Sequence, residues 1–559
     1  MRSLTLVPAL PALAVPVLLL GPLLLLPLAS ATAAPPMLPG WPQFMGVAGL
    51  FAPVGVTLAD LDGDGDLEVI AGSTDNFMRA WNHDGTLLAG WPVNLGGQIQ
   101  SKAAAADLDG DGDLEILVAV KTGMLHVLQA NGAPLAGWPK PWGGAFGFIA
   151  PSVRDLDGDG RPEVLIGGGG SVYAYRADGT LLWTRVVGGN ITGTLATGDV
   201  NGDGRPEIFA VAVGPNTLHG LAADGTVLPG WPRNFGLSNS WAAPAIGDLD
   251  GDGRREVLVV GYSFGNFSQI FAFRGDGTSP PGFPVTYPSV QTYSCPVIGD
   301  VDGDGDLELF NAGKVNAAPS YYAWNHLGAV LPGWPEPLDN MEGSTILADF
   351  DGEPQMEAVI ADNYNPGHLY GYNVDGSTAS DFPVPTPAAC LPNSPAVGDV
   401  DGDGDLDLAM TSANGAVAVW DFAVAWNPAA VEWGTLFHDN WHTNQHGFQV
   451  PGGSAAVADP ARSRPLRLAL GLPAPNPAAP RTVIPFILPE AAEVRLTVVD
   501  VAGREVRALA AGGFAGGAHS IAWDGRNARG EAVARGVYWL RLEAPAAGAP
   551  LVQKIVVGR

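Results

Sequence analysis

The sequence has little cysteine and few basic residues. Its 559 residues include 2 cysteines, which excludes a fold held together by a framework of disulfides. Lys and Arg together number 28 against 57 Asp and Glu, so the formal net charge is −29. A chain with this charge repels phosphate backbones, and we therefore expect no nucleic-acid partner.

Long apolar runs and sustained helical periodicity are also missing. Beyond residue 34 no stretch reaches 18 uninterrupted apolar residues, so we expect no transmembrane segment in the mature chain. Within residues 1–34, Arg2 precedes a Leu-, Ala- and Pro-rich run that ends in the small residues ASATA. This pattern predicts a signal peptide over residues 1–34 and a secreted or cell-surface protein. An uncleaved anchor is the alternative, and the prolines in the run disfavour a stable spanning helix.

What the chain does contain is an eight-fold acidic repeat. The motif DLDGDGDLE, or a close variant, recurs with steps of 44 to 52 residues. A period of about 48 residues falls in the range for propeller blades. The motifs begin at Asp60, Asp107, Asp155, Asp199, Asp248, Asp300, Asp349 and Asp399.

The spacing within the motif indicates a metal-binding loop. Positions 1, 3, 5 and 9 carry carboxylate or amide oxygens, the ligands that Ca²⁺ prefers, and glycines at positions 4 and 6 allow the loop to curl. At position 7, where the residue is Asp, Arg or Gln, we expect the backbone carbonyl to be the ligand. The helical EF-hand loop fits poorly because its last carboxylate lies at position 12, which is Ala71 in the first motif.

The predicted metal-binding residues are those at positions 1, 3, 5, 7 and 9. In the first four motifs they are Asp60, Asp62, Asp64, Asp66, Glu68, Asp107, Asp109, Asp111, Asp113, Glu115, Asp155, Asp157, Asp159, Arg161, Glu163, Asp199, Asn201, Asp203, Arg205 and Glu207. In the last four they are Asp248, Asp250, Asp252, Arg254, Glu256, Asp300, Asp302, Asp304, Asp306, Glu308, Asp349, Asp351, Glu353, Gln355, Glu357, Asp399, Asp401, Asp403, Asp405 and Asp407.

The charge balance also favours bound cations. Positions 1, 3, 5 and 9 hold 31 of the 57 carboxylates, which repel one another within each loop when no cation is present. We therefore expect about eight calcium ions as cofactors, with solvated acidic turns as the alternative. The seventh motif is the weakest match to the pattern, because it has Glu353 at position 5 and Pro354 in place of a glycine.

Each unit reads as four short strands. A β-rich run follows the motif, and an Asp-Gly or Asn-Gly hairpin signal such as Asp84-Gly85 comes about 25 residues after its first Asp. Most units then contain Gly-Trp-Pro or Gly-Phe-Pro. Four-stranded antiparallel units in series predict an all-β fold, an eight-bladed β-propeller, with seven blades as the alternative. Either end of the repeat region could supply the strand that closes the ring.

With these motifs and their flanking strands, the chain resembles the FG-GAP/VCBS repeat family. Repeats of that family form calcium-loaded propellers in integrin α chains and in many secreted bacterial proteins, so the resemblance implies a propeller over residues 35–447. Asn201 in the fourth motif and the degenerate seventh motif depart from the pattern.

A different domain is expected at the C-terminus. Residues 448–466 read as a linker, and five or more short strands in residues 467–559 predict an immunoglobulin-like β-sandwich. The pieces VDVAGREV, WDGR and GVY resemble the FlgD-like Ig domain and the related sorting domain of the type IX secretion system. The resemblance leaves both a sorting role and a plain structural role open.

Three histidines offer a competing site. His438, His442 and His446 are spaced by four residues, as on a metal-binding helix, but no Glu follows His438 and the HExxH motif is absent. We expect this segment to pack Trp441 and His442 against the closing blade.

Other candidate residues have simpler explanations. Arg274-Gly-Asp276 coincides with a hairpin turn, and the two cysteines, Cys295 and Cys390, fall in units that are not neighbours. Aromatic residues in irregular places are candidates for ligand stacking: Tyr287, Tyr293, Tyr364 and Trp142.

The sequence contains no recognisable catalytic set. We therefore expect a monomeric, non-enzymatic binding or adhesion module for an extracellular glycan or protein. The alternative is a propeller-fold polysaccharide lyase or hydrolase in which calcium neutralises a uronate carboxylate, although the uniform spacing leaves little room for an active-site loop. A quinone-dependent dehydrogenase is a weaker option, because its tryptophan-docking pattern is missing.

Overall fold

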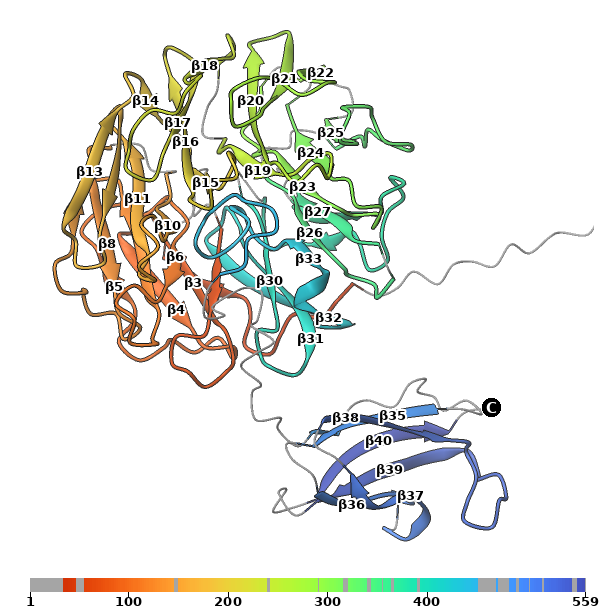
Figure 1. The fold of residues 1–559 in the computed structure, drawn as a ribbon. Coiled ribbons are helices and arrows are strands. Elements are labelled where there is room, and N and C mark those ends of the chain that lie inside the picture. Colours follow the sequence, from red (N-terminus) through yellow and green to blue (C-terminus); the bar gives the residue numbers. More distant parts are fainter. Residues whose placement is uncertain are drawn as a thin grey trace, which may run out of the picture.

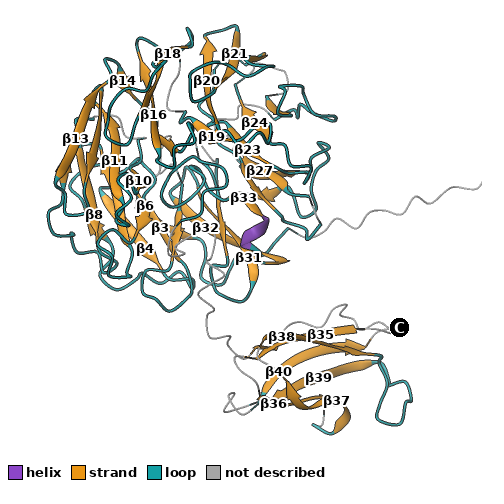
Figure 2. Ribbon diagram, viewed as in Figure 1, coloured by secondary structure: helices purple, strands orange, loops and turns teal. Residues whose placement is uncertain are grey.

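Strands dominate the computed structural model of this chain (Figures 1 and 2). Within the described residues the one helical element is the 3-10 turn η1 (Pro428–Ala430), and none of them belongs to a helix long and apolar enough to cross a membrane. The predicted signal peptide lies almost wholly outside the described residues. The structure describes residues 34–46, 55–144, 149–238, 242–289, 291–314, 320–338, 343–353, 355–362, 366–389, 393–450, 469–470, 482–488, 492–501, 503–514, 517–544 and 550–557.

Up to residue 450, the described strands form eight small antiparallel sheets, one per repeat. Figure 1 shows them arranged around an axis. The first strands are β2 (Thr57–Ala59), β6 (Ala104–Ala106), β10 (Ser152–Arg154), β15 (Ala196–Gly198), β19 (Ala245–Gly247), β23 (Val297–Gly299), β26 (Ile346–Ala348) and β30 (Ala396–Gly398). The second strands are β3 (Glu68–Gly72), β7 (Glu115–Val120), β11 (Glu163–Gly168), β16 (Glu207–Val213), β20 (Glu256–Ser263), β24 (Glu308–Ala312), β27 (Glu357–Ala361) and β31 (Asp405–Thr411).

The third and outer strands complete the sheets, except that the sixth sheet has three strands among the described residues. The third strands are β4 (Phe77–Trp81), β8 (Met124–Leu128), β12 (Ser171–Tyr175), β17 (Thr217–Leu221), β21 (Phe267–Phe273), β25 (Tyr321–Trp324), β28 (His368–Tyr372) and β32 (Ala416–Ala425). The outer strands are β5 (Val93–Asn94), β9 (Lys140–Pro141), β13 (Leu181–Val186), β18 (Arg233–Asn234), β22 (Val285–Tyr287), β29 (Val384–Pro385) and, for the last sheet, β1 (Gln43–Phe44). An extra strand, β14 (Asn190–Ile191), pairs with β16.

The N-terminal end supplies the closing strand. β1 pairs with β32, with Gln43 opposite Val417 and Phe44 opposite Ala416, so the last sheet contains both ends of the repeat region. The sequence left open which end would do this. The predicted all-β propeller fold is confirmed.

The Gly-Trp-Pro segments brace each sheet against the next one. The Trp138 indole N–H donates to the Ala177 carbonyl at 2.8 Å, in the hairpin of the following sheet, and the equivalent bond from Trp231 to Gly275 is 2.9 Å. The preceding glycine allows this approach: Gly137 has φ +92°, and a Cβ there would lie 2.1 Å from the Asp178 carbonyl oxygen. Apolar clusters fill the space between adjacent sheets. The recurring aromatics are therefore packing residues.

Residues 431–448, the axial segment, occupy the centre of the ring (Figure 1). They begin with β33 (Val431–Trp433), which pairs with β26. The segment then hydrogen-bonds to the first strands of successive sheets, in their order around the axis. These bonds join Val397 N–H to Gly434 O, Ala105 N–H to Asn440 O, Val153 N–H to Trp441 O, Thr197 N–H to Thr443 O and Ile246 N–H to Asn444 O, at 2.8 to 3.1 Å.

The axial segment corrects the prediction for the histidines. Trp441 and His442 do not pack against the closing sheet. Trp441 joins the core between the second and third sheets, and the His442 ring lies 2.8 Å from the Pro151 carbonyl beside the third sheet. His438 and His442 are buried, so they offer no open metal site.

Several other predicted roles are also resolved. Trp142 and Tyr287 are buried core residues, so their prediction as exposed binding aromatics was wrong, and Tyr293 is half-buried. Arg274 and Asp276 flank a hairpin turn closed by the Gly277 N–H on the Arg274 carbonyl, as predicted. Cys295 is a buried free thiol. Tyr364 and Cys390 lie outside the described residues.

The C-terminal part is a separate sandwich of two sheets. One contains β34 (Ala469–Leu470), β35 (Thr482–Leu488) and β38 (Gly517–Trp523); the other contains β36 (Ala492–Val499), β37 (Glu505–Phe514), β39 (Gly536–Glu543) and β40 (Leu551–Val557). Its core includes Phe486, Leu496, Trp523 and Leu540. The predicted Ig-like class is confirmed. Most of the predicted linker lies outside the described residues.

Candidate metal centres

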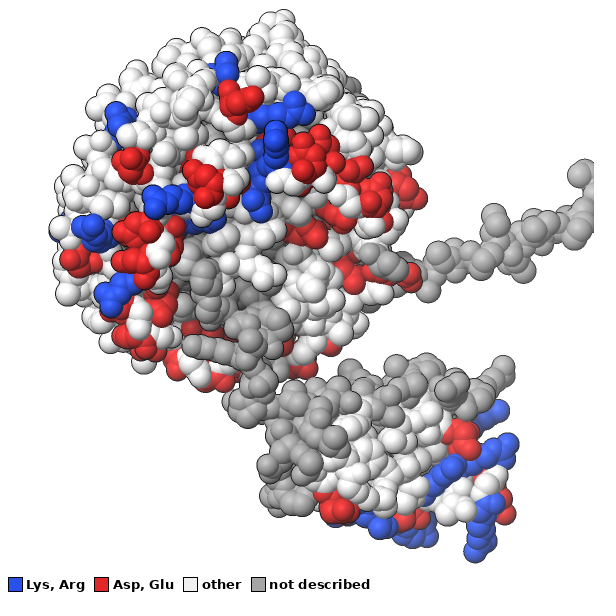
Figure 3. Space-filling model, in the orientation of Figure 1, with Lys and Arg blue, Asp and Glu red and all other residues white. Residues whose placement is uncertain are grey.

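Each acidic motif connects the first strand of its sheet to the second. Because every sheet uses the same connection, the eight loops lie at the same end of the ring, and neighbouring loops touch. The Leu67 N–H donates to the Val400 carbonyl at 2.9 Å across the closure, and the Met356 N–H donates to the Val301 carbonyl at 3.1 Å. Figure 3 shows acidic side chains gathered over the propeller. The loops therefore form a band at one end of the ring, in which several acidic turns contact the next one.

The third loop shows how the backbone shapes each site. The Asp155 carboxylate accepts the Gly158 N–H at 2.7 Å and the Gly160 N–H at 3.0 Å. Asp157 accepts the Asp159 N–H at 3.2 Å. Both glycines have positive φ, +78° and +86°, which residues with a Cβ rarely adopt. Hydrogen bonds from the backbone to the aspartates thus curl the loop, and the same bonds hold the carboxylates in place.

Position 9 closes the loop from the second strand. The Glu163 carboxylate accepts the Leu156 N–H at 2.9 Å, and the same bond recurs in every motif, from Glu68 with Leu61 to Asp407 with Val400. This carboxylate is buried in all eight loops. Burial, with the neighbouring aspartates, raises the pKa of Glu68 to about 8 and that of Glu115 to about 7. Such a group needs a nearby cation to stay ionised at neutral pH.

The structure brings several predicted residues into metal-binding distance of one another. Within each group, one ligand oxygen from every member lies within 4.8 Å of the others. In the five groups named next, the members come from positions 1, 3 and 9, or from positions 1, 3 and 5 in the sixth loop. Five of the groups are Asp60, Asp62 and Glu68; Asp107, Asp109 and Glu115; Asp155, Asp157 and Glu163; Asp248, Asp250 and Glu256; and Asp300, Asp302 and Asp304.

An orphaned oxygen tests whether these donors suit a cation. The buried Asp300 Oδ1 of the sixth loop makes no hydrogen bond, although the other oxygen of this carboxylate accepts the Gly305 N–H at 3.1 Å. A buried carboxylate oxygen without a partner costs free energy that a hard cation would recover. The donor set contains only oxygens and is negative, so the residues fit a hard divalent ion.

Position 7 contributes differently from the other predicted positions. The Asp66 side chain lies 2.9 Å from His83 and the Asp306 side chain 3.2 Å from His326, both in the hairpin of the same sheet. These side chains are turned toward the hairpin, which favours the backbone at this position. The seventh loop curls like the others: Asp349 accepts the Gly352 N–H and Glu357 accepts the Phe350 N–H, at 2.6 and 2.7 Å. Pro354 lies outside the described residues.

A second cluster of ionisable groups lies in the axial segment. Asp439 is buried and accepts the Trp441 N–H at 2.8 Å and the Thr443 N–H at 3.2 Å, and it pairs with His438 at 2.8 Å. Lys102 is buried and donates to the Thr435 hydroxyl. Burial lowers the pKa of Lys102 to about 7. These groups hold the segment in the channel and are closed to ligands.

Small residues before the acidic motifs are the sequence signal that could have indicated the axial segment. The residue before each motif is Ala or Gly in seven of eight repeats, and these residues face the axis. A Cβ at Gly198 would lie 2.6 Å from Gln445 Oε1, and one at Gly299 would lie 2.9 Å from Glu432 Cβ. The exception, Arg154, stacks its guanidinium 4.1 Å from the Phe448 ring centre.

Comparison with known families agrees with this geometry. The FG-GAP-like repeat matches residues 60–118, 155–210, 199–259, 248–310 and 349–410, and the FlgD Ig-like domain matches residues 479–548. The chain is an FG-GAP-like repeat protein with a FlgD Ig-like domain. No curated protein sequence matches it.

Solved structures similar to this FG-GAP-like repeat protein are propellers. The biofilm matrix protein Bap1 of V. cholerae has a TM-score of 0.52 and 16% identity, with 77% of this chain and 97% of that chain covered. Sqt1 of Saccharomyces cerevisiae has a TM-score of 0.50 and 12% identity, covering 70% and 99%. At these identities the likeness concerns the fold.

Proposed function

We propose that this protein is an exported, calcium-stabilised propeller that acts as a binding or adhesion module for an extracellular glycan or protein. The observation that carries the calcium assignment is the curled acidic loop, repeated around the ring, whose carboxylates converge and whose position-9 carboxylate is buried. Ca²⁺ accepts six to eight oxygen ligands in flexible geometry, which suits such a loop. We propose about eight ions, one for each loop.

In the loaded loops, positions 1, 3, 5 and 9 would supply carboxylate or amide oxygens and position 7 a backbone carbonyl. The ion would neutralise the loop and join the first and second strands of each sheet. The closed axial channel directs any partner to the outer surfaces of the ring. Resemblance of the fold to a biofilm matrix protein supports an extracellular, adhesive role, and we propose that the protein is a monomer.

The test is an assay on acidic and neutral polysaccharides with calcium present. Mature protein is incubated with each polymer, and both retention and the appearance of new chain ends are recorded. Retention without new ends supports adhesion and identifies the ligand class. New ends that disappear on calcium removal would replace the proposal with a lyase or hydrolase. Absence of both signals would contradict a glycan ligand and leave a protein partner.

A further inference from the structure

The eight acidic loops differ in how many basic residues lie near their carboxylates. Positions 7 and 8 of the fifth motif are Arg254 and Arg255, whereas the eighth motif has Asp405 and Leu406 there. Figure 3 shows that the surface charge also varies around the ring: basic side chains lie among the acidic ones on one part of the visible face, whereas the part near β24 and β27, of the sixth and seventh sheets, is acidic.

A second position sharpens this contrast, and only the strand register reveals it. The residue opposite position 9 lies within the third strand or directly after it; in the eighth sheet it is Asp421, within β32 and opposite Asp407. In the fifth sheet the register places Arg274 opposite Glu256. Side chains directly opposite each other in an antiparallel pair share one face of the sheet. This residue therefore belongs to the surroundings of the loop, although it lies far from the motif in sequence.

Arg274 contacts the carboxylates of the fifth loop. Its Nε lies 3.6 Å from Glu256 Oε1, an oxygen that makes no hydrogen bond, and its Nη2 lies 4.0 Å from Asp250 Oδ2. Asp250 and Glu256 belong to the group that the structure brings within metal-binding distance. Arg255 adds a further cation, whose guanidinium donates to the Asp199 carbonyl of the preceding loop at 3.2 Å.

The eighth loop has the opposite environment. Asp421, which lies opposite Asp407, adds a carboxylate to a loop that already has five aspartates. No basic residue stands in the motif. A guanidinium beside two ligands competes with a divalent ion, whereas an added carboxylate favours it.

We infer that Arg274 is a resident counter-cation of the fifth loop, so that this loop binds calcium most weakly and the eighth loop, with Asp421, binds it most tightly. This inference rests on the proposed calcium binding. It divides the repeats into loops that need the metal to relieve repulsion and at least one that is largely neutralised by the protein itself.

The experiment measures calcium bound per chain by equilibrium dialysis over a range of free calcium, for the full mature chain. Arg274→Gln is expected to tighten the weakest class of site roughly tenfold, and Asp421→Asn to weaken the tightest class by a similar factor. Arg176→Gln is the matched control: Arg176 begins the same turn in the third sheet, but it is exposed and forms no salt bridge among the described residues. This variant should leave the isotherm unchanged.

Two failures remain distinguishable. If the wild-type chain binds no calcium, the proposed function fails. If it binds calcium but Arg274→Gln gives the wild-type isotherm, the role of Arg274 is overturned while the calcium proposal stands. Melting curves at saturating calcium show whether a variant is folded, and Arg274→Lys, which keeps the charge, should restore weak binding.

Discussion

At the scale of single residues, the inter-sheet contacts depend on a few specific atoms. Each Gly-Trp-Pro tryptophan donates its indole N–H to a carbonyl in the following hairpin, as Trp334 does to Val374 at 2.9 Å. Phe283 and Phe382 occupy the same place in two repeats, where the ring alone suffices. The hydrogen bond is therefore an addition to aromatic packing, and its contribution can be measured separately.

Trp334→Phe should cost about 1 kcal/mol of unfolding free energy, because the ring still fills its site and one buried hydrogen bond is lost. Urea unfolding at saturating calcium measures the change. Trp539→Phe serves as the control, since Trp539 is partly exposed on the Ig-like domain and should cost little. A loss of several kcal/mol for Trp334→Phe would show that the ring packing also depends on the indole shape.

Lys102 makes stability depend on pH. Its pKa is lowered to about 7 by burial, from 10.5 for a free lysine, so above pH 7 the unfolded chain binds one proton that the folded chain has lost. Stability from this group therefore rises with pH between about 7 and 10.5, by at most about 1.4 kcal/mol per pH unit. Lys102→Met should flatten this rise in urea unfolding between pH 7.5 and 9.5. Parallel pH profiles for both proteins would contradict it.

At the scale of elements, the axial segment and the loops have complementary roles. The loops join strands within a sheet and touch the next loop, whereas the axial segment bonds to first strands around the whole ring. Its turns are held by Asp439, which accepts bonds from Trp441 and Thr443 and pairs with His438.

Asp439→Ala should destabilise the propeller by about 3 kcal/mol or more, because several buried donors lose their acceptor together. Asp224→Ala is a matched control: Asp224 also accepts the N–H and hydroxyl of a threonine two residues on, Thr226, but it is exposed in a hairpin turn. Its cost should stay near 1 kcal/mol. Equal losses for the two variants in urea unfolding would argue against a locking role for the axial segment.

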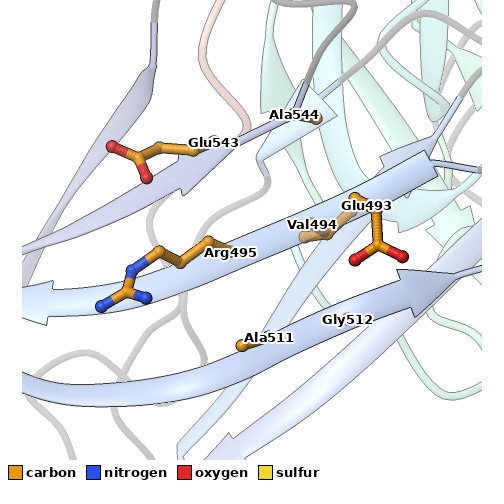
Figure 4. Close-up of a pocket in the computed structure, with 7 residues that line it drawn as sticks. All are labelled: Glu493, Val494, Arg495, Ala511, Gly512, Glu543 and Ala544. Carbon is orange, nitrogen blue, oxygen red and sulfur yellow. The ribbon is translucent and has the colours of Figure 1, made fainter.

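The Ig-like domain has a shallow hollow lined by residues of β36, β37 and β39. Figure 4 shows Glu493 and Arg495 of β36 beside Glu543 of β39. Arg495 is already paired with Glu505 at 2.7 Å, and Glu543 with Arg541 at 2.7 Å. Arg495 and Glu543 are thus paired with residues outside the hollow, which leaves no charged pair directed at a particular ligand.

At the scale of the whole molecule, charge and closure decide stability. A net charge of −29 concentrated in one band of loops opposes folding, and bound cations would remove that repulsion. Closure through β1 and the axial segment joins the repeats into one unit, so relief at each loop should stabilise the entire ring.

Chelation with excess EGTA should therefore lower the melting temperature sharply, on the order of 10 °C or more, and added calcium should restore it. Differential scanning calorimetry on the full mature chain measures both. Magnesium at the same concentration should restore less, because it demands a stricter six-ligand geometry. A melting curve unchanged by EGTA would overturn calcium as a structural cofactor.

The sequence by itself determined the repeat, the acidic loops, the hairpin turns and the all-β class. These follow from local rules: glycines at positions 4 and 6 permit the curl, carboxylates at fixed spacing converge, and Asp-Gly turns join adjacent strands. A backbone contribution at position 7 stays a prediction, which rests on the occurrence of Arg and Gln there as well as Asp.

Only the tertiary structure decided how distant segments meet. It placed β1 in the last sheet, threaded residues 431–448 along the axis, buried Trp142 and Tyr287, and set Arg274 and Asp421 beside the fifth and eighth loops. The places of β1 and of residues 431–448 depend on closing a ring of eight sheets, where contacts join residues hundreds of positions apart, whereas those of Arg274 and Asp421 depend on strand register within one sheet. Local pattern specifies the repeating unit, and the packing of units against each other and around the axis specifies what differs between them.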